Sequence, residues 1–420
     1  MFRRKYVWRS VAVLGVATLA LTACADDDGG DDGQDSGEET FSGTLTIGAI
    51  LPETGSLAAY GEGMFAAVDL AVQDINEAGG VWGNDVEVIH RDEGESAQAD
   101  IVQSAADFMV EQGAHAIVGA ASSTSSLNII ETLNSAQIIQ VSPANTAPDF
   151  TDHEFGDFYF RTAPSDILQG SALAEEILAD GHATIGILAM QNSYGEGLAD
   201  HIEQVYTNGG GQVVAKEFFD PEATEFASEI GTVRDANPDA VVLISYEQSR
   251  QIIPAMVGGG IGPQDKQLYL VDGNRLDYSE DFDPGLMAGA KASQPGAEEE
   301  PTEFFARIDA FRPDLPERAY VPESYDATVI IALAAIAANS DDPTAIRDEM
   351  VGITKDGEKC TDFASCKQLL EQGSDIDYDG ITGVISWTDA GDPGEATIGI
   401  YEYGEDNTFE RIKSVPATME

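Results

Sequence analysis

The sequence predicts an α/β protein with two doubly wound lobes, each built on a parallel sheet, joined by a hinge. Short apolar runs with the length of buried strands alternate with helical patterns along most of the chain. About 375 residues follow the acidic amino-terminal stretch, which is more than one hydrophobic core usually serves. The alternation pauses over residues 161–166 and then restarts, so we expect the hinge there and a second lobe beyond it.

Residues 1–23 have the organisation of a signal peptide. Four basic residues precede an apolar run over 11–20, which is shorter than the about 20 residues that a membrane-spanning helix needs. Residues 21–24, Leu-Thr-Ala-Cys, resemble a bacterial lipobox, which implies cleavage before Cys24 and lipidation of its thiol. The alternative is an ordinary secretory signal with a chance cysteine. We therefore expect a protein anchored by lipid to the outer face of the cell membrane.

Residues 24–43 are expected to form this lipidated cysteine and a disordered acidic linker, because residues 25–40 contain no large apolar side chain. The net charge of the chain is −54, and it becomes −58 when the four basic residues of the signal peptide are lost. Such a surface repels nucleic acid and anionic headgroups, so neither is an expected partner. The charge otherwise indicates solubility, and no transmembrane segment is expected in the body of the chain.

The first lobe opens with alternating strands and helices. Apolar residues recur at helical spacing from Met64 to Ile75, and Gly79 and Gly80 give a typical helix end. The expected elements are strands over 45–51, 86–90, 116–119, 138–141 and 158–162 and helices over 64–75, 97–111 and 127–133.

The second lobe repeats the alternation, and the chain then returns to the first. Its expected elements are helices over 167–179, 194–206, 225–236 and 248–257 and strands over 184–190, 212–215, 240–245 and 267–271. Helices over 304–311, 325–338 and 346–350 follow, the second apolar on nearly all sides, and then an antiparallel pair of 382–387 with 397–402. The expected lobes are 44–164 with 295–378 and 165–294 with 379–415.

Two hydroxyl clusters, Ser122–Ser126 and Ser142–Thr146, each follow a predicted strand. In a parallel sheet both would lie at the carboxyl edge, where such folds bind ligands. Capping of the next helix is the commoner use of such residues. A cradle for a carboxylate is the functional alternative, because hydroxyls and helix amino termini bind anions.

Motifs for catalysis and cofactors are absent from the sequence. There is no Gly-x-Gly-x-x-Gly or Gly-Lys-Ser/Thr phosphate loop, no His-Glu-x-x-His and no Gly-x-Ser-x-Gly elbow. Cys360 and Cys366 have no nearby histidine, and in an oxidising compartment a pair so close in sequence favours a local disulfide. We expect no enzyme, no cofactor and no metal.

Tyr60, Tyr194, Tyr246 and Asp272 follow predicted strands. Singly, each tyrosine is more often a core aromatic, and the aspartate more often caps a turn. A carboxylate facing a cleft would bind an ammonium group through a charge-assisted hydrogen bond. With the hydroxyl clusters opposite, these residues favour a site for a zwitterion.

Several loops, in their order and spacing, resemble those of the leucine/isoleucine/valine-binding proteins, which are extracytoplasmic receptors of ABC importers for branched-chain amino acids. These are Gly55–Gly61, Asp74–Val81, Ser122–Ser125, Ser142–Pro148, Tyr194–Gly197 and Asp272–Gly273. The resemblance covers essentially everything from Thr44 to the tail. It implies the periplasmic binding protein type I architecture, hinge closure about an amino acid, and delivery to a membrane permease.

The resemblance also implies roles for single residues. Ser123 and Thr146, with the main chain of Ala144, would bind the α-carboxylate, and Asp272 would bind the ammonium group. This chain has an aspartate where branched-chain members more familiarly have a glutamate. Three tyrosines would complete the site and two further residues are weaker candidates: Tyr60, Tyr194 and Tyr246, then Asp166 and Tyr325.

Other functions remain open on the sequence alone. A receptor for a short amide, urea or an aromatic acid would use the same fold with Asp272 or the hydroxyls idle. A sensory ligand-binding module would signal instead of feeding a transporter. A secreted enzyme would need a catalytic constellation that the sequence does not show.

Overall fold

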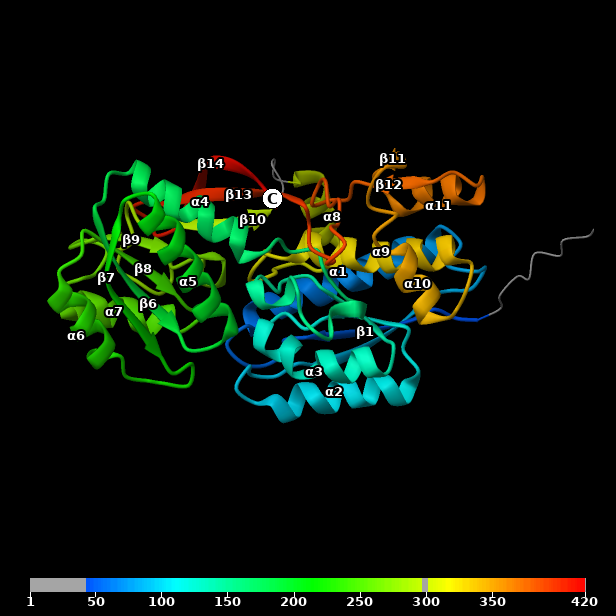
Figure 1. Cartoon of the computed structure of the whole chain (residues 1–420), viewed down its shortest axis with the longest axis horizontal. Helices are drawn as coiled ribbons and strands as arrows, with labels where there is room; N and C mark the ends of the chain where they lie inside the picture. Colours follow the sequence, from blue (N-terminus) through cyan, green and yellow to red (C-terminus); the bar gives the residue numbers. More distant parts are fainter. Residues whose placement is uncertain (1–42, 297–300, 420) are drawn as a thin grey trace, which may run out of the picture. The chain divides into compact units, whose positions relative to one another are not determined.

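The computed structural model describes residues 43–296 and 301–419, so the predicted signal peptide, Cys24 and nearly all of the linker lie outside the described residues. The described residues all belong to one compact unit. Two large sheets with helices on their faces dominate this unit, as the alternation of strands and helices predicted (Figure 1), and β11 (Glu358–Cys360) and β12 (Ile376–Tyr378) form a small third sheet.

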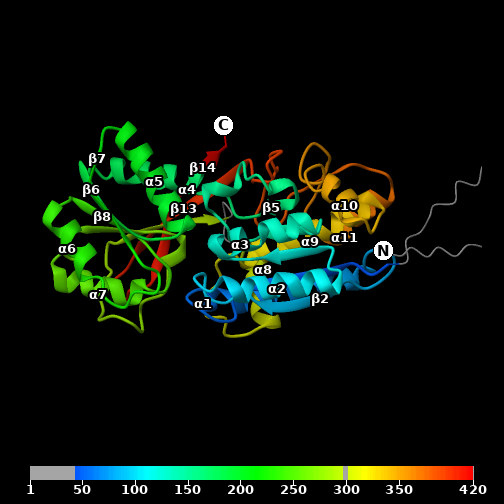
Figure 2. The same ribbon diagram turned by 60° about the horizontal axis from the view of Figure 1, so that its bottom comes forward.

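The first sheet is parallel throughout, with strand order β2-β1-β3-β4-β5. Helices α2 and α3 cover one face, and α1 and α9 cover the other (Figures 1 and 2). The bounds are β1 Thr46–Leu51, β2 Glu87–Asp92, β3 Ala116–Gly119, β4 Ile139–Ser142, β5 Tyr159–Arg161, α1 Ala58–Glu77, α2 Ala99–Gln112, α3 Ser123–Ser135 and α9 Val321–Ala338.

The second sheet has seven strands in the order β14-β13-β10-β9-β8-β6-β7. The strands from β7 to β10 are parallel, and β13 and β14 add an antiparallel edge. The bounds are α4 Asp166–Ala179, β6 Thr184–Met190, α5 Ser193–Asn208, β7 Gln212–Phe219, α6 Ala227–Ala236, β8 Ala240–Ile244, α7 Ser249–Gly259, β9 Gln267–Leu270, β10 Lys291–Gly296, β13 Glu395–Tyr403 and β14 Phe409–Thr418.

The antiparallel pair predicted for the tail is wrong. Strand β13 pairs with β14, whereas residues 382–387 contribute only two isolated bridges, Gly383 with Gly380 and Trp387 with Pro393. The segment of β14 mixes charged residues with Pro416, so its sequence hides the alternation of an edge strand. The tight connection over residues 404–408 joins the true pair.

The remaining elements extend the first lobe. They are α8 Thr302–Phe311, α10 Pro343–Glu349, β11 Glu358–Cys360, α11 Phe363–Glu371 and β12 Ile376–Tyr378. Cys360 and Cys366 form the predicted disulfide between β11 and α11. Helix α9 is long and apolar enough to cross a membrane, but 83% of that stretch is buried inside the protein, as expected for a core helix.

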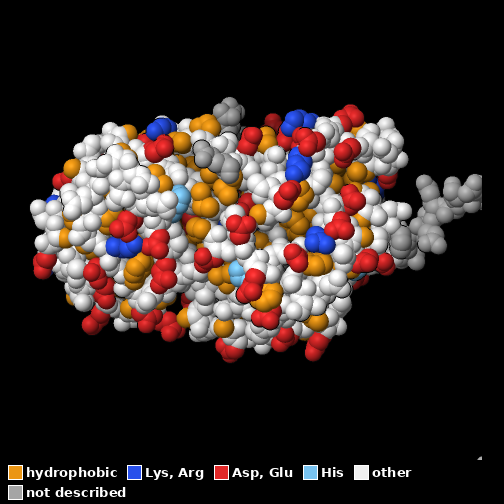
Figure 3. Space-filling model, viewed as in Figure 1, with side chains coloured by type: hydrophobic (Ala, Val, Ile, Leu, Met, Phe, Trp, Pro, Cys, Tyr) orange, Lys and Arg blue, Asp and Glu red, His pale blue; other side chains and the backbone are white. Residues whose placement is uncertain are grey.

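The chain passes between the two sheets three times: from β5 to α4, after β10, and before β13. At the first crossing the Arg161 guanidinium is fully buried, and its Nε donates to Asp392 Oδ1 at 2.5 Å. Trp387 Nε1 donates to the carbonyl of Arg161 at 2.6 Å, which ties the third crossing to the first. Acidic side chains spread over the face in Figure 3 and basic ones are few, in keeping with the net charge.

Candidate functional site

One cavity lies between the carboxyl edges of the two sheets. Its volume is about 20 Å³, which is room for about one water. Its walls contain seven of the residues predicted from sequence: Tyr60, Ser123, Ala144, Thr146, Tyr194, Tyr246 and Asp272. They also contain residues that the sequence did not single out: Leu57, Met64, Ala121, Gly273 and Tyr320.

Asp272 is the acidic centre of the cavity and is only 3% exposed. It begins a short 3₁₀ turn, Asp272–Asn274, directly after β9. Its Oδ1 accepts hydrogen bonds from Tyr194 Oη at 2.6 Å and from Gln169 Nε2 at 2.9 Å, and its Oδ2 accepts one from Tyr320 Oη. Tyr320 immediately precedes α9, so this last bond joins the first lobe to the second.

Four tyrosines surround this carboxylate, and none of them can ionise easily. Burial, and then the negative charge of Asp272, raise the pKa of Tyr194, Tyr246 and Tyr320 well above its usual value. Their hydroxyls therefore stay neutral donors. The rings of Tyr194 and Tyr246 are stacked, with centroids 5.3 Å apart. Tyr60 Oη lies 3.3 Å from the carbonyl oxygens of Asp272 and Gly273 and makes a second contact between the lobes.

Gly273 is required by this packing. A Cβ atom there would lie 2.8 Å from the carbonyl oxygen of Ser245 and 2.9 Å from Tyr194 Oη. Real side chains do not approach other atoms so closely, so a larger residue would displace the tyrosine from Asp272.

The amino terminus of α3, which was the expected anion cradle, already holds a carboxylate from the protein. Glu93 is fully buried and accepts the N–H groups of Ala121 at 2.5 Å and Ser122 at 2.9 Å. Burial raises the pKa of Glu93 to about 8. Ser122 also caps the helix, because its side chain accepts from the N–H of Ser125. The capping role is therefore confirmed, and the backbone N–H groups of Ala121 and Ser122, next to the start of the helix, already bind an internal carboxyl group.

The second hydroxyl cluster is also bonded within the protein. Ser142 Oγ accepts the N–H of Ala144 at 3.3 Å, and Ser123 Oγ accepts the N–H of Ala147 at 3.4 Å. Thr146 Oγ1 donates to Asp166 Oδ2 at 2.9 Å. A ligand carboxylate could accept a hydrogen bond from the Ser123 hydroxyl without any rearrangement. The Thr146 hydroxyl would first have to turn away from Asp166.

Asp166, one of the weaker candidates, lies behind Thr146 at the start of α4 and does not line the cavity. It is fully buried, and its Oδ1 has no hydrogen-bond partner. Burial, and then repulsion by Asp272, raise its pKa well above the usual value. A second carboxyl group thus lies behind the wall of the cavity without lining it.

Tyr325, the other weaker candidate, is not in this cavity. Its Oη donates to Asp74 Oδ2 at 2.6 Å, on the face of α9 that packs against α1. The phenol that does reach the site comes from Tyr320, five residues earlier, where a left-handed backbone (φ 63°) precedes the helix. No group of three or more metal-ligating side chains occurs among the residues that the structure describes.

The chain matches the model of a family described as periplasmic binding protein over residues 44–373. A curated relative named Leu/Ile/Val-binding protein homolog 3, from Brucella melitensis, is 23% identical and aligns over 86% of this chain and 92% of its own length. A leucine-, isoleucine-, valine-, threonine- and alanine-binding protein of Pseudomonas aeruginosa is 26% identical, with 88% and 92% covered. A chemotactic signal transduction system substrate-binding protein of Halobacterium salinarum is also 26% identical, with 83% and 84% covered.

Solved structures share the fold at lower identity. A leucine-binding protein of Thermotoga maritima has a TM-score of 0.74 at 20% identity, covering 89% of this chain and 99% of its own. A branched-chain amino acid transporter substrate-binding protein of Streptococcus pneumoniae, in complex with isoleucine, has a TM-score of 0.70 at 21% identity, with 90% and 100% covered. An ABC transporter solute-binding protein of R. palustris, in complex with benzoate, has a TM-score of 0.73 at 16% identity, with 90% and 98% covered.

Proposed function

This chain belongs to the periplasmic binding protein family, and on that premise we propose that it is the extracytoplasmic receptor of an ABC importer for an α-amino acid. The predicted resemblance to the leucine/isoleucine/valine-binding proteins and the type I fold are confirmed by the family match and the relatives. Members of this family are solute-binding proteins of transporters. The proposal includes closure of the predicted lobes, 44–164 with 295–378 and 165–294 with 379–415, about the ligand.

The observation that carries the ligand class is the placement of Asp272 across the cavity from Ser123 and Thr146. A buried carboxylate that already accepts two phenol hydroxyls is suited to a further, charged donor such as an ammonium group. The hydroxyl of Ser123 can donate a hydrogen bond to the ligand carboxylate.

A receptor for an aromatic acid is the principal alternative, since a structural neighbour binds benzoate. Such a ligand could place its carboxylate at the Ser123 hydroxyl, but it would add a negative charge near Asp272 and bring no ammonium group to that carboxylate, which disfavours it electrostatically. A short amide or urea would leave the hydroxyl cluster without a carboxylate. A sensory module is a further alternative because of the chemotactic relative.

A thermal-shift screen of the mature protein tests the ligand class. A ligand that binds only the folded state adds about 2.7 kcal/mol of stability at a hundredfold excess over its Kd. We expect α-amino acids to raise Tm and expect amides, urea and aromatic acids to leave it unchanged. A rise with benzoate or an amide alone, undiminished in Asp272→Ala, would replace the amino acid by that ligand.

Transport and anchoring are tested in cells. Deletion of the gene should abolish uptake of the radiolabelled ligand, whereas loss of chemotaxis with normal uptake would favour the sensory module. We also propose that Cys24 is lipidated after cleavage of residues 1–23. Cys24→Ser should then release the protein from the membrane fraction and abolish labelling by a clickable palmitate analogue.

A further inference from the structure

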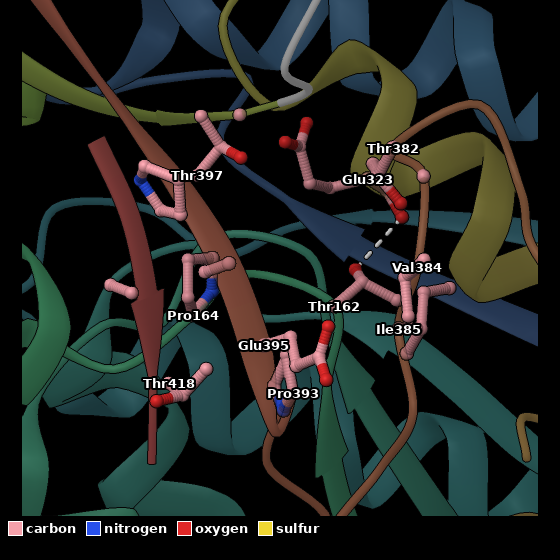
Figure 4. A pocket seen from close by; sticks show the side chains of 15 residues that line it. Thr162, Pro164, Glu323, Thr382, Val384, Ile385, Pro393, Glu395, Thr397 and Thr418 are labelled. Atoms are coloured by element: carbon pink, nitrogen blue, oxygen red, sulfur yellow. Dashed lines mark hydrogen bonds between the residues drawn. The ribbon is translucent and has the colours of Figure 1, made fainter. Parts of the chain in front are cut away.

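A second cavity lies where the crossing segments run between the lobes (Figure 4). We call it the hinge cavity; its walls include Thr162, Pro164, Gly296, Glu323, Glu395 and Thr397. Its volume is about 350 Å³, whereas that of the cavity at Asp272 is about 20 Å³. No lining residue is shared by the two cavities.

Glu323 is the unusual group in the hinge cavity. It lies in the first turn of α9 and is only 4% exposed, yet its Oε2 has no hydrogen-bond partner. Figure 4 shows its carboxylate extending from the helix into the open space, while its carbonyl oxygen accepts the Thr162 hydroxyl at 2.9 Å. A buried polar atom without a partner costs free energy, and a bound donor would remove that cost.

The chemistry of the walls indicates what kind of donor would bind. Glu395 supplies a second carboxylate, and no Lys, Arg or His is among the described residues that line the cavity. Burial, and then the nearby charge of Asp326, raise the pKa of Glu323 to about 8, as expected for a carboxyl group without a cationic partner. Pro164, Val384 and Ile385 provide apolar surface beside these carboxyl groups.

The cavity is preformed rather than a gap beside a loose loop. Asp326, one turn after Glu323 on α9, accepts the N–H of Thr382 at 2.8 Å and its hydroxyl at 2.6 Å, and also accepts the N–H of Ile381 at 3.0 Å. These bonds fix the wall formed by residues 382–385. A ligand would therefore lose little free energy in organising its own site.

We propose that the hinge cavity is a second binding site, for a small molecule with a protonated amino group on a compact apolar body. The amino group binds Glu323, with Glu395 contributing charge, and the apolar part packs on the proline and aliphatic side chains. Because the crossing segments line this site, the bound cation holds the lobes in the arrangement described here. The site does not depend on which solute binds at Asp272.

Isothermal titration with three probes of one shape tests the site: 2-phenylethylammonium, neutral 2-phenylethanol and anionic 3-phenylpropionate. We expect the cation to bind at least tenfold more tightly than either of the others. Glu323→Gln should weaken the affinity for the cation at least tenfold. Glu225→Gln, which removes an exposed carboxylate on another surface, should change that affinity less than twofold. Equal affinity for the three probes, or for wild type and Glu323→Gln, would overturn the proposal.

A second pair of variants keeps the test decisive if Glu323→Gln does not fold. Val384 lines the cavity and is 47% exposed, so Val384→Arg places a competing guanidinium at the site without disturbing the core. Val257, 41% exposed on α7, is the matched control. We expect Val384→Arg to lower the affinity for the cationic probe at least tenfold and Val257→Arg to lower it less than twofold. Equal effects of the two substitutions would overturn the proposal.

Discussion

Asp272→Asn should weaken binding of an α-amino acid much more than binding of its analogue without the amino group. The substitution keeps the shape of the side chain and removes the charge that faces the ligand ammonium. Tyr194 and Tyr320 can still hydrogen-bond to an asparagine, because a hydroxyl both donates and accepts. The fold should therefore survive, and the loss should be confined to the ligand.

The size of the effect follows from burial. Removing one partner of a buried, hydrogen-bonded charge pair costs about 2–5 kcal/mol, or about 30-fold to several thousand-fold in Kd. Two phenols and the Gln169 amide already share the charge of Asp272, so we expect the lower end, about 30- to 100-fold, which corresponds to about 2 to 3 kcal/mol.

The assay is a double-mutant cycle by isothermal titration, with leucine and 4-methylpentanoate against wild type and Asp272→Asn. The coupling free energy should be about 2 kcal/mol or more, since only leucine carries the ammonium group. Asp235→Asn, on the exposed face of α6, is the control and should leave both affinities unchanged. A coupling below about 0.5 kcal/mol would show that Asp272 does not bind the ammonium and would refute the zwitterion site.

Three further predictions concern single groups. Tyr320→Phe removes a hydrogen bond to buried Asp272 and should raise the Kd of the amino acid about tenfold, which corresponds to about 1.5 kcal/mol. An unchanged Kd would show that this contact between the lobes does not contribute to binding. The pKa of Glu93 is raised from 4.5 to about 8, so the contribution of this carboxyl group to the free energy of unfolding is complete below its pKa in the unfolded chain and is lost as pH rises toward 8. Glu93→Gln should therefore flatten the decrease of the urea midpoint between pH 5 and 8. An unaltered slope would argue against a protonated Glu93. Replacing Cys360 and Cys366 by serine opens a short loop and should cost about 2 kcal/mol by urea unfolding while leaving ligand affinity within twofold; a large loss of affinity would mean that this clip shapes the site.

The parts of the site that follow strands could be predicted, because topology alone brings them together. Ser123, Thr146, Tyr246 and Asp272 follow β3, β4, β8 and β9, and the carboxyl ends of parallel strands share one edge of a sheet. Strand and helix patterns fix that placement without knowledge of any contact. The hydrogen bond from Thr146 to Asp166 could not be foreseen, since it depends on how the first crossing packs.

Tyr320 and Glu93, which the sequence did not reveal as site residues, have no pattern that places them. Tyr320 lies in the irregular segment between α8 and α9, where no periodicity places a side chain. Glu93 is one of 75 acidic residues, and only burial beside α3 distinguishes it from the rest. Tyr325 was misplaced for a different reason. The sequence predicts that α9 is a helix, but not which of its apolar faces meets α1.

The charge in the cavity links ligand chemistry to lobe closure. Asp272 belongs to the second lobe, and Asp166, bonded to Thr146, lies where the lobes join. Repulsion by Asp272 adds to burial in raising the pKa of Asp166, and the described lining residues include no Lys, Arg or His. Closing the lobes without ligand therefore buries the negative charge of Asp272, which hydrogen bonds share but which no cation among the described lining residues neutralises. An ammonium group offsets that cost only when the lobes meet around it, which is the differential interaction that a ligand needs to drive closure. A neutral or anionic ligand lacks this contribution, so under the proposed function Asp272 would both bind the amino group and select for it.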